Sequence, residues 1–292
     1  MIGETLALGS AILWAAAVIN FKRSGETMSP FSLNLVKNLI ATTLMLPTAL
    51  LIDGLNFPVL SADQWLLLIA SGVVGIGVAD QMYFMALNRI GASRTGIAAS
   101  LFSPSVVMLS VVFLGESLTA WQLSGLVSVV GGIMLISYRS NAREIESASQ
   151  LRSGILIAGG AVFLMALCIV AIKHIIESQP FMWVVETRLA AGVLGMLLVA
   201  ALRGRLKQVQ AELRAPHHWR RIVIASVFGT YLAMMAFMGG YRYTDASVAS
   251  VLNETAAMFI MLFAWMFLGE TLSPRKISGV CLTFFGVVLM LV

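Results

Sequence analysis

The stretch "FLGESL" at residues 113–118 returns as "FLGETL" at residues 267–272, 154 positions further along the chain. Each copy stands between two long apolar runs. The similarity is wider than the phrase, because residues 83–137 align without a gap with residues 237–291 at the same offset. This regular match predicts that the chain consists of two copies of one structural unit.

The composition indicates the class of protein in which this unit occurs. Of the 292 residues, 59% are hydrophobic and 11% are charged, and the mean hydropathy is +0.91. Soluble domains carry about 25% charged residues, so the sequence predicts an integral membrane protein. No cleavable signal sequence is recognisable at the start. Ten apolar runs are long enough to cross about 30 Å of hydrocarbon as helices. They lie near residues 2–21, 31–52, 65–87, 94–114, 120–138, 152–172, 181–202, 220–240, 246–268 and 274–292.

Ten spans shared between two copies give five spans per copy, and this odd number determines how the copies are oriented. The second copy crosses the membrane in the opposite sense to the first, an inverted-topology repeat that is typical of secondary transporters. We assign residues 1–138 to the first repeat, 139–150 to a cytoplasmic linker and 151–292 to the second repeat. The expected fold class is therefore all-α, with ten transmembrane helices in two inverted five-helix repeats.

The basic residues alternate between the loops. Fifteen of the 19 Lys and Arg residues fall in the five odd-numbered loops, and only Lys173 and Arg242 fall in loops on the opposite side. Short cytoplasmic loops are enriched in Lys and Arg. The bias predicts that both termini lie outside the cell. The membrane that the chain crosses is expected to be the cytoplasmic (inner) membrane of a bacterium. The basic loop between the seventh and eighth spans has room for a short amphipathic helix on anionic lipid, although a topology signal alone explains its charge.

The repeated phrase is typical of a tight turn between two helices. Gly115 and its counterpart Gly269 suit the left-handed conformation that ends a helix. Thr119, with Gln122 three residues later, matches a capping box at the start of the next helix. For Glu116 and its counterpart, a solvated or interfacial position is favoured over a further role.

These features together resemble one family. Ten spans, two five-helix halves and an "LGE.L" turn after the fourth and the ninth span resemble the EamA-type branch of the drug/metabolite transporter superfamily, over the whole chain. The resemblance implies a transporter whose cavity is lined mainly by the third, fourth, eighth and ninth spans. Members include bacterial exporters of amino acids and related metabolites, and some importers. Many members of the family keep both termini in the cytoplasm. The loop charges of this chain predict the opposite orientation.

Four ionisable residues fall at bilayer depth: Lys37, Asp80, Arg188 and Glu254. Each costs at least about 2.5 to 3.5 kcal/mol to insert, so such groups usually face the bundle interior and have a partner or a task. At 1.5 Å per residue, the first two lie about 10 and 13 Å from the cytoplasmic face, and the other two about 12 to 13 Å from the outer face. We expect one cation–anion pair per repeat, Lys37 with Asp80 and Arg188 with Glu254; a purely structural salt bridge is the alternative.

Three of the charges belong to polar helix faces with i, i+3, i+4 spacing. These faces are Asn34, Lys37 and Asn38; Gly77, Asp80, Gln81 and Phe84; and Ser250, Asn253, Glu254 and Ala257. Ser100 belongs to a similar polar stripe in the fourth span, for which close packing of small residues is the alternative. Tyr83 is a candidate pocket wall, although aromatic residues in spans more often pack or anchor at the interface. The predicted substrate-binding or coupling residues are therefore Lys37, Asp80, Arg188, Glu254, Asn34, Asn38, Gln81, Tyr83, Ser100 and Asn253.

Two interior cations and two interior anions suit a zwitterion. The leading hypothesis is a secondary transporter that moves a small metabolite, an amino acid or a related zwitterion, by alternating access and in the direction of export. Asp80 and Glu254 are the candidates for coupling to protons. An uncoupled facilitator, an exporter of hydrophobic cations, and a non-transporting scaffold or receptor stay open as alternatives.

No group of reactive residues indicates an enzyme. The histidines, His174, His217 and His218, lie at span ends or in a loop, and there is no Ser/His/Asp arrangement, metal-ligand spacing or glycine-rich nucleotide loop. Cys168 and Cys281 both fall inside spans, where we expect core positions and no disulfide. We expect no cofactor, metal or nucleic-acid partner. One chain holds both halves, so a monomer is sufficient and a dimer stays open.

Overall fold

The computed structural model describes the chain except for residues 25–27, 138–147, 217 and 269–272, and every regular element in the described part is a helix. Six helices are long and apolar enough to cross a membrane, in agreement with the predicted all-α membrane protein. They are Pro30–Ile52, Ala62–Ala86, Ser149–Ala171, Phe181–Leu202, Trp219–Tyr243 and Ala246–Phe263, and shorter apolar helices are Ile2–Ala17, Phe102–Phe113 and Ala120–Ile136.

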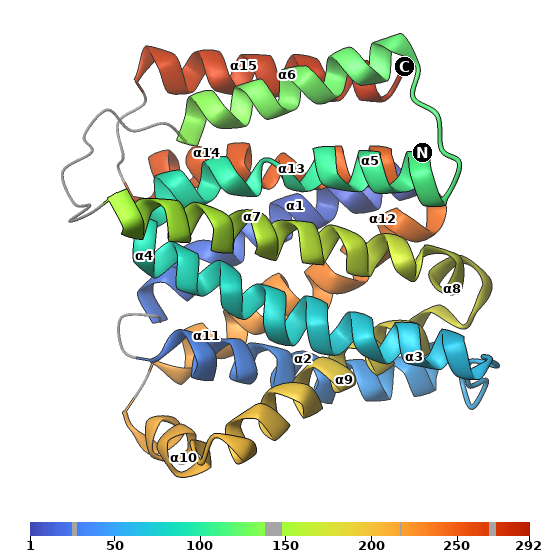
Figure 1. Ribbon diagram of the computed structural model, residues 1–292, viewed down its shortest axis with the longest axis vertical. Helices are drawn as coiled ribbons and strands as arrows, with labels where there is room; N and C mark the ends of the chain where they lie inside the picture. The colour runs from blue at the N-terminus through green and yellow to red at the C-terminus, as the bar shows by residue number, and fades with distance from the viewer. Residues whose placement is uncertain (25–27, 138–147, 217, 269–272) are drawn as a thin grey trace.

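The helices run alongside one another between two ends of the molecule, and both termini lie at the same end (Figure 1). In chain order the elements are α1 (Ile2–Ser24), α2 (Pro30–Ile52), α3 (Ala62–Ala70), η1 (Ser71–Ala79), α4 (Asp80–Ala99), α5 (Phe102–Phe113), α6 (Ala120–Ser137), α7 (Ala148–Ala171), α8 (Lys173–Ser178), α9 (Phe181–Leu202), α10 (Leu206–Arg214), α11 (Trp219–Ser226), η2 (Val227–Leu232), α12 (Ala233–Tyr243), α13 (Ala246–Glu254), α14 (Ala256–Leu268) and α15 (Pro274–Met290).

Two of the predicted spans are interrupted helices. The predicted fourth span is broken at Ser100 and Leu101, between α4 and α5, and the predicted ninth span is broken at Thr255, between α13 and α14. Leu101 and Thr255 correspond to each other in the repeat alignment. The loop expected near residues 88–93 is also different, because α4 continues through it as a helix. Apolar length predicted the spans, but it carries no information on where a helix breaks inside them.

Two π-helical segments also occupy equivalent positions. η1 covers residues 71–79 and η2 covers residues 227–232, which align with residues 73–78 of the first half. In η1 the backbone N–H of Asp80 donates to the carbonyl of Gly75, an i→i−5 bond. Such segments are rare and frequently lie at functional sites. Here η1 leads directly into the residue predicted as the acidic partner of Lys37.

Glycines allow α6 and α15 to lie side by side at one edge of the molecule (Figure 1). A Cβ atom on Gly125 would lie 2.8 Å from the carbonyl oxygen of Gly286, and one on Gly279 would lie 2.8 Å from that of Gly132. Position 125 thus meets 286 while 132 meets 279, so the two helices run antiparallel. Gly125 aligns with Gly279 and Gly132 with Gly286, so each contact is the repeat-related copy of the other.

The turn of the repeated phrase has the expected local structure in the first half. Gly115 takes a positive φ of 69°, as a helix-ending glycine does. The side-chain oxygen of Gln122 accepts a hydrogen bond from the backbone of Thr119 at 3.0 Å, and the hydroxyl of Thr119 accepts one from the backbone of Gln122 at 3.2 Å. This capping box is therefore confirmed, while Gly269 lies outside the described residues.

Glu116 has a structural role that the sequence did not indicate. Its carboxylate accepts hydrogen bonds from the backbone N–H groups of Ala246 and Ser247, at 2.7 and 2.9 Å, and from the Ser247 hydroxyl at 2.6 Å. It thus caps the N-terminus of α13, where a negative charge is favourable. Asp53 does the same for α9, accepting from the backbone of Met182 at 2.7 Å. Acids in turns of the first half therefore cap helices of the second half, near the end that holds the termini.

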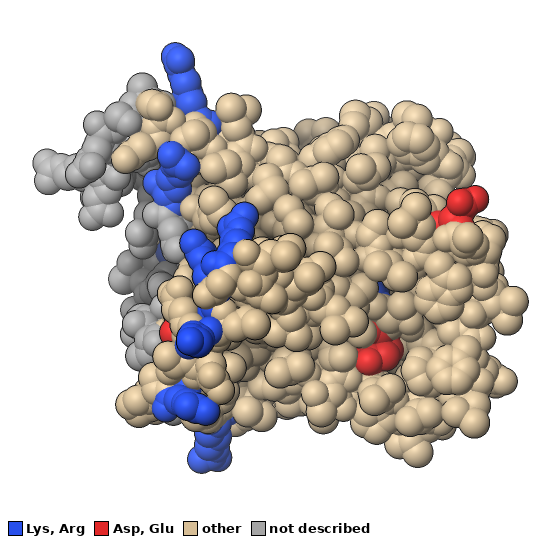
Figure 2. Space-filling view, turned by 60° about the horizontal axis from the view of Figure 1, so that its bottom comes forward, with Lys and Arg blue, Asp and Glu red and all other residues tan. Residues whose placement is uncertain are grey.

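The opposite end is basic. Figure 2 shows the Lys and Arg side chains of one face gathered at one end of the molecule, where α10 lies. Burial alone would raise the pKa of Glu212 on α10, but hydrogen bonds from Ser29, Ser32 and Gln208 outweigh it and hold this pKa below its ordinary value. The basic loop thus contains a short amphipathic helix, α10, and the hydrogen bonds between Glu212 and Ser29 fix it to the start of α2.

The expected core positions of the two cysteines are half right. Cys168 on α7 is buried, close to the largest apolar cluster, but Cys281 on α15 is exposed. Both thiols are free. The prediction for Cys281 was wrong because a membrane span has a lipid-facing side, and position within the span does not tell which side a residue occupies.

Candidate functional site

Lys37 and Asp80 form an ion pair in the interior of the helix bundle. The Nζ of Lys37 lies 3.3 Å from the Oδ2 of Asp80, and the two side chains are 7% and 26% exposed. The ammonium also lies 5.9 Å from the ring centroid of Trp14 on α1. The predicted pairing of these two residues is therefore present, and it leaves Lys37 compensated by a carboxylate and an aromatic face.

Asn34 links α2 to its neighbours, and Asn38 supports it. The amide of Asn34 donates to the carbonyl oxygen of Ile76 in η1 at 3.3 Å, and the amide of Asn38 donates to the backbone and side-chain oxygens of Asn34 at 2.9 and 3.0 Å. Both asparagines are fully buried. Asn34 thus joins α2 to the π-helical segment, and Asn38 supports Asn34 from one turn further along the same helix.

Arg188 on α9 is buried and lies close to the same cluster. It is 5% exposed, and its Nε and Nη1 atoms have no hydrogen-bond partner in the part of the chain that the structure describes. Its Nη2 atom lies 3.3 Å from the position that a Cβ atom on Gly75 would occupy, so the missing side chain in η1 makes room for the guanidinium. Arg188 interacts electrostatically with Asp80 and Tyr241.

The predicted pairing of Arg188 with Glu254 is wrong. Glu254 instead accepts a hydrogen bond through Oε1 from the backbone N–H of Ser103, at 2.6 Å, in the first turn of α5. Depth along a span was the basis of the prediction, but depth does not determine the direction in which a side chain leaves its helix. The break after α13 and the start of α5 bring Glu254 to a helix N-terminus, which stabilises a carboxylate.

Tyr241 on α12 is also buried near these charges. Its side chain is fully buried, and its hydroxyl has no hydrogen-bond partner among the described residues. It interacts electrostatically with both Glu254 and Arg188. The second oxygen of Glu254, Oε2, is also buried without a partner in the described part of the chain. Buried polar groups normally have partners, so these unpaired atoms need an explanation such as a ligand or water.

The remaining predicted residues surround this cluster in different ways. Gln81 is half-buried, and its Oε1 atom has no partner among the residues described. Tyr83 is half-buried, with its ring 6.2 Å from that of Phe84 in an edge-on arrangement. Ser100 is buried at the break before α5. Asn253 donates to the carbonyl of Ala249 in its own helix at 2.9 Å, which is a local contact.

The cluster offers charged and hydrogen-bonding groups and no metal site. No group of three or more His, Cys, Asp or Glu side chains suited to a metal ion occurs within the described ranges. Sequence reasoning missed Tyr241 because it stands in an aromatic run near the end of α12, where an interfacial anchor is the usual interpretation. It also missed Gly75 as a neighbour of Arg188.

Comparison with known proteins decides the family. The sequence model of the EamA-like transporter family matches residues 1–138 and 152–292, nearly the whole chain. The chain belongs to the EamA-like transporter family. The resemblance noted in the repeated turns is thus confirmed, and the molecule is a multi-pass membrane protein of a transporter family.

Curated relatives match over the whole chain or over about half of it. An uncharacterized transporter of Archaeoglobus fulgidus is 25% identical over 295 residues, covering 100% of this chain and 98% of the relative. The uncharacterized transporter YvbV of Bacillus subtilis is 29% identical over 151 residues, covering 49% of this chain and 47% of its own. One crystal structure matches with a TM-score of 0.79 at 18% identity, over 98% of this chain and 95% of the other, which shows a common fold.

Proposed function

We propose that this EamA-like protein is a secondary transporter built from ten membrane spans in two inverted five-helix repeats, residues 1–138 and 151–292, joined by a linker at 139–150. Three features support the repeat. The glycine contacts between α6 and α15 are copies of each other, the two π-helical segments align, and the breaks at Leu101 and Thr255 align. The family match in two parts is in keeping with the same division. Related halves of this kind support alternating access.

The basic end is proposed to lie in the cytoplasm. Exposed basic residues gather at that end, whereas both termini lie at the other end (Figures 1 and 2). Short loops rich in Lys and Arg remain on the cytoplasmic side of a membrane. On this proposal both termini lie outside the cytoplasmic membrane of a bacterial cell. A single chain suffices for the proposed mechanism, with no cofactor and no nucleic-acid partner.

The proposed substrate is a small zwitterion, an amino acid or a relative of one. The observation that carries this proposal is the buried guanidinium of Arg188, whose Nε and Nη1 atoms lack partners among the described residues. Burying an unpaired charge is expensive, and a carboxylate can accept two hydrogen bonds from a guanidinium. Asp80 interacts with Arg188 and is partly accessible. We assign the substrate carboxylate to Arg188 and its ammonium to Asp80.

Glu254 is proposed to carry the coupling proton. Its Oε1 atom accepts a bond from the N-terminus of α5, while its Oε2 atom is buried without a partner among the described residues. Protonation of this carboxyl would weaken its hold on the α5 terminus, which lies in the other half of the chain. A carboxyl at bilayer depth that contacts a helix break is a suitable proton site for a carrier. Inward movement of protons would then drive export of the substrate.

A counterflow series tests the assignment of the charges. Proteoliposomes are loaded with one amino acid, and external competition is measured with that amino acid, with the amine lacking its carboxylate, and with the acid lacking its ammonium group. We expect only the complete zwitterion to compete well, and we expect Arg188→Gln to lose that preference by tenfold or more, since charged hydrogen bonds are each worth about 1.5–3 kcal/mol. Equal competition by the amine would contradict a role for Arg188.

Export of a hydrophobic cation is the second candidate function. Lys37 is compensated by Asp80, while the oxygen of Glu254 that has no partner among the described residues offers a negative site that interacts with Tyr241. A quaternary ammonium compound suits an acid flanked by an aromatic ring. The same counterflow assay separates the two candidates, because such a compound should compete in Arg188→Gln as well as in the unchanged protein, whereas an amino acid should not.

A further inference from the structure

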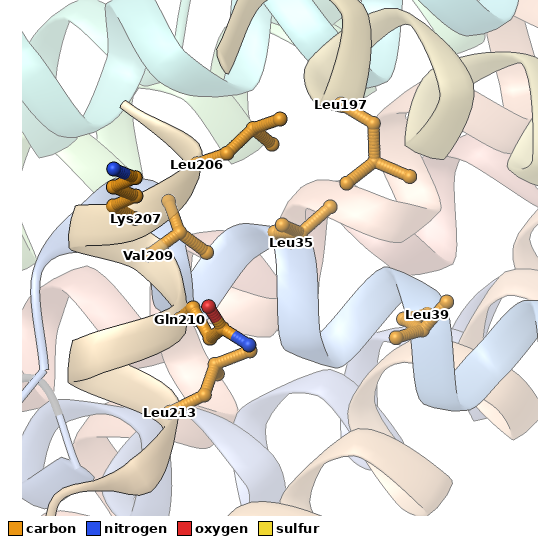
Figure 3. A pocket seen from close by; sticks show the side chains of 8 residues that line it. All are labelled: Leu35, Leu39, Leu197, Leu206, Lys207, Val209, Gln210 and Leu213. Carbon is orange, nitrogen blue, oxygen red and sulfur yellow. The ribbon is translucent and has the colours of Figure 1, made fainter. Parts of the chain in front are cut away.

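A groove of about 370 Å³ opens where α10 crosses α2 and α9 (Figure 3). Its walls are apolar and come from three helices. They are Leu35 and Leu39 of α2, Leu197 of α9, and Leu206, Val209 and Leu213 of α10. Lys207 and Gln210, both on α10, complete the lining. None of these residues belongs to the buried polar cluster, so this is a separate feature of the molecule.

Specific contacts hold α10 against its neighbours, so the groove is a defined part of the structure. On its apolar side, Val209 is 7% exposed and packs in one cluster with Leu35 and Met196. On its polar side, an oxygen of Glu212 accepts hydrogen bonds from the hydroxyl of Ser29 at 2.6 Å and from its backbone N–H at 3.3 Å. Ser29 is also the N-cap of α2. Contacts of both kinds therefore hold α10 across the start of that helix.

The open side of the groove is suited to hydrocarbon. Leu39, Leu197 and Leu206 are 47%, 36% and 45% exposed. Leu39 lies nine residues beyond Pro30, which at 1.5 Å per residue is about 13 Å along α2 from the basic end. An exposed apolar patch of this kind marks an interaction site or a membrane contact. The groove therefore extends from the level of α10 into the depth of the acyl chains.

The basic residue of the groove lies at one edge, away from the leucines on α2 and α9 (Figure 3). In Figure 3 Lys207 lies on the side of α10 away from Leu39 and Leu197. Arg203 and Arg205, just before α10, are exposed as well. Anionic lipids attract such residues at a cytoplasmic surface. With the basic end at the membrane surface, as proposed above, this cationic edge would sit at headgroup level and the leucines would reach deeper, which is the order of charge and hydrocarbon in a phospholipid.

We propose that this groove binds one anionic phospholipid, with an acyl chain along the leucines of α2 and α9 and the phosphate at Lys207. The site is independent of what the transporter carries. A lipid held here contacts the outer face of α2, the helix whose inner face presents Lys37 to Asp80. Its occupancy should therefore stabilise the bundle around the candidate site, although no substrate needs to be bound.

Native mass spectrometry of the purified full chain tests the headgroup. The probes are dioleoylphosphatidylglycerol and dioleoylphosphatidylcholine, added separately in detergent. We expect one phosphatidylglycerol to be retained more strongly than phosphatidylcholine, and Lys207→Gln to lower that preference about fivefold, the usual effect of one basic residue near an anionic surface. Arg214→Gln is the control on the same helix, because Arg214 does not line the groove. Equal retention of both lipids, or equal effects of both substitutions, would overturn the proposal.

A second pair of variants tests the acyl chain. Leu39→Trp fills the groove, whereas Leu50→Trp places the same side chain on the same helix outside it, at a site of nearly equal exposure, 47% against 44%. Both side chains are exposed, so both variants should fold. Leu39→Trp should lose the retained lipid and Leu50→Trp should keep it. If both variants keep the lipid, it sits elsewhere; if both lose it, the binding is a general property of the surface.

Discussion

Glu254, the last residue of α13, accepts a hydrogen bond of 2.6 Å from the backbone N–H of Ser103 in the first turn of α5. The acid comes from the second half of the chain and the helix terminus from the first. Each stands within three residues of a break in its span, at Thr255 and at Leu101. A contact between two interrupted helices near the middle of the bundle is a position at which binding or protonation can alter how the halves meet.

The first prediction concerns the coupling role of Glu254. Glu254→Gln keeps an oxygen for the N–H of Ser103 but cannot release a proton, so the contact should persist while its response to the proton gradient is lost. Uphill movement driven by a pH gradient in proteoliposomes should disappear, and exchange of substrate at equal pH should remain largely intact. Unchanged uphill transport in this variant would remove Glu254 from the coupling role.

The second prediction separates pairing from binding at Lys37 and Asp80. Asp80→Asn alone leaves a buried ammonium with one partner fewer, which costs about 3–5 kcal/mol when a buried pair is broken. The exchanged double variant, Lys37→Asp with Asp80→Lys, should recover thermal stability because the pair is restored. It should not recover transport, since the substrate ammonium would then meet a lysine. Recovery of both properties would mean that neither residue contacts the substrate.

The third prediction ranks three glycine-to-alanine substitutions in η1 by their effect on stability. A Cβ atom on Gly72 would overlap the carbonyl oxygen of Arg188, one on Gly75 would lie 3.3 Å from the Arg188 guanidinium, and one on Gly77 would lie 3.6 Å from Met196. Gly72→Ala should destabilise the protein by about 1–3 kcal/mol through overpacking. Gly77→Ala meets only ordinary contacts and should be neutral or stabilising by up to about 1 kcal/mol.

Thermal unfolding in detergent measures the stability of the three variants, and Gly75→Ala is also tested for transport. The Gly75→Ala variant should change stability little. It should weaken substrate affinity in counterflow, because the Arg188 guanidinium must shift to avoid the new methyl group. Equal stability of the three variants would show that α9 and η1 do not pack as closely as the structure has them.

The sequence predicted the helix bounds and the basic end better than it predicted the partners of the buried charges. Apolar length gave the bounds of α2 and α9 almost to the residue, and loop charge identified the basic end. The ion pair of Lys37 and Asp80 was also predictable, because both lie at one depth. The partners of Arg188 and Glu254 were not, since helix breaks and the π-helical turn of η1 decide where those side chains point, and hydropathy does not record either feature.

A fourth prediction uses the pKa of Glu212, which hydrogen bonds hold below its ordinary value despite burial. A carboxyl with a lowered folded pKa stabilises the folded state above its unfolded pKa and loses this contribution as the pH falls through the folded value. The attachment of α10 to Ser29 should therefore weaken on acidification. After correction for the intrinsic exchange rate, which itself falls on acidification, the protection of the α10 amides should decrease at low pH, and Glu212→Gln should remove this pH dependence. Exchange that is equally pH-dependent in the variant would place the sensitivity elsewhere.

The cap formed by Glu116 gives a fifth prediction. Glu116→Ala removes the acceptor for the backbone groups of Ala246 and Ser247, and loss of a helix cap costs about 0.5–2 kcal/mol. Glu116→Gln keeps one acceptor oxygen and should cost less. Ser117→Ala, at the exposed neighbouring position, is the control. Thermal unfolding should rank the three variants in that order, and an equal effect of Ser117→Ala would mean that the turn, and not the cap, is sensitive.

The two halves are proposed to cross the membrane in opposite senses around a charged interior. Single cysteines introduced at Ile2 and Leu151, after replacement of Cys168 and Cys281, place a label near the start of each half. An impermeant thiol reagent should label Ile2→Cys in intact cells and Leu151→Cys only after permeabilisation. Labelling of both positions from the same side would contradict the inverted repeat and, with it, the proposed mechanism of transport.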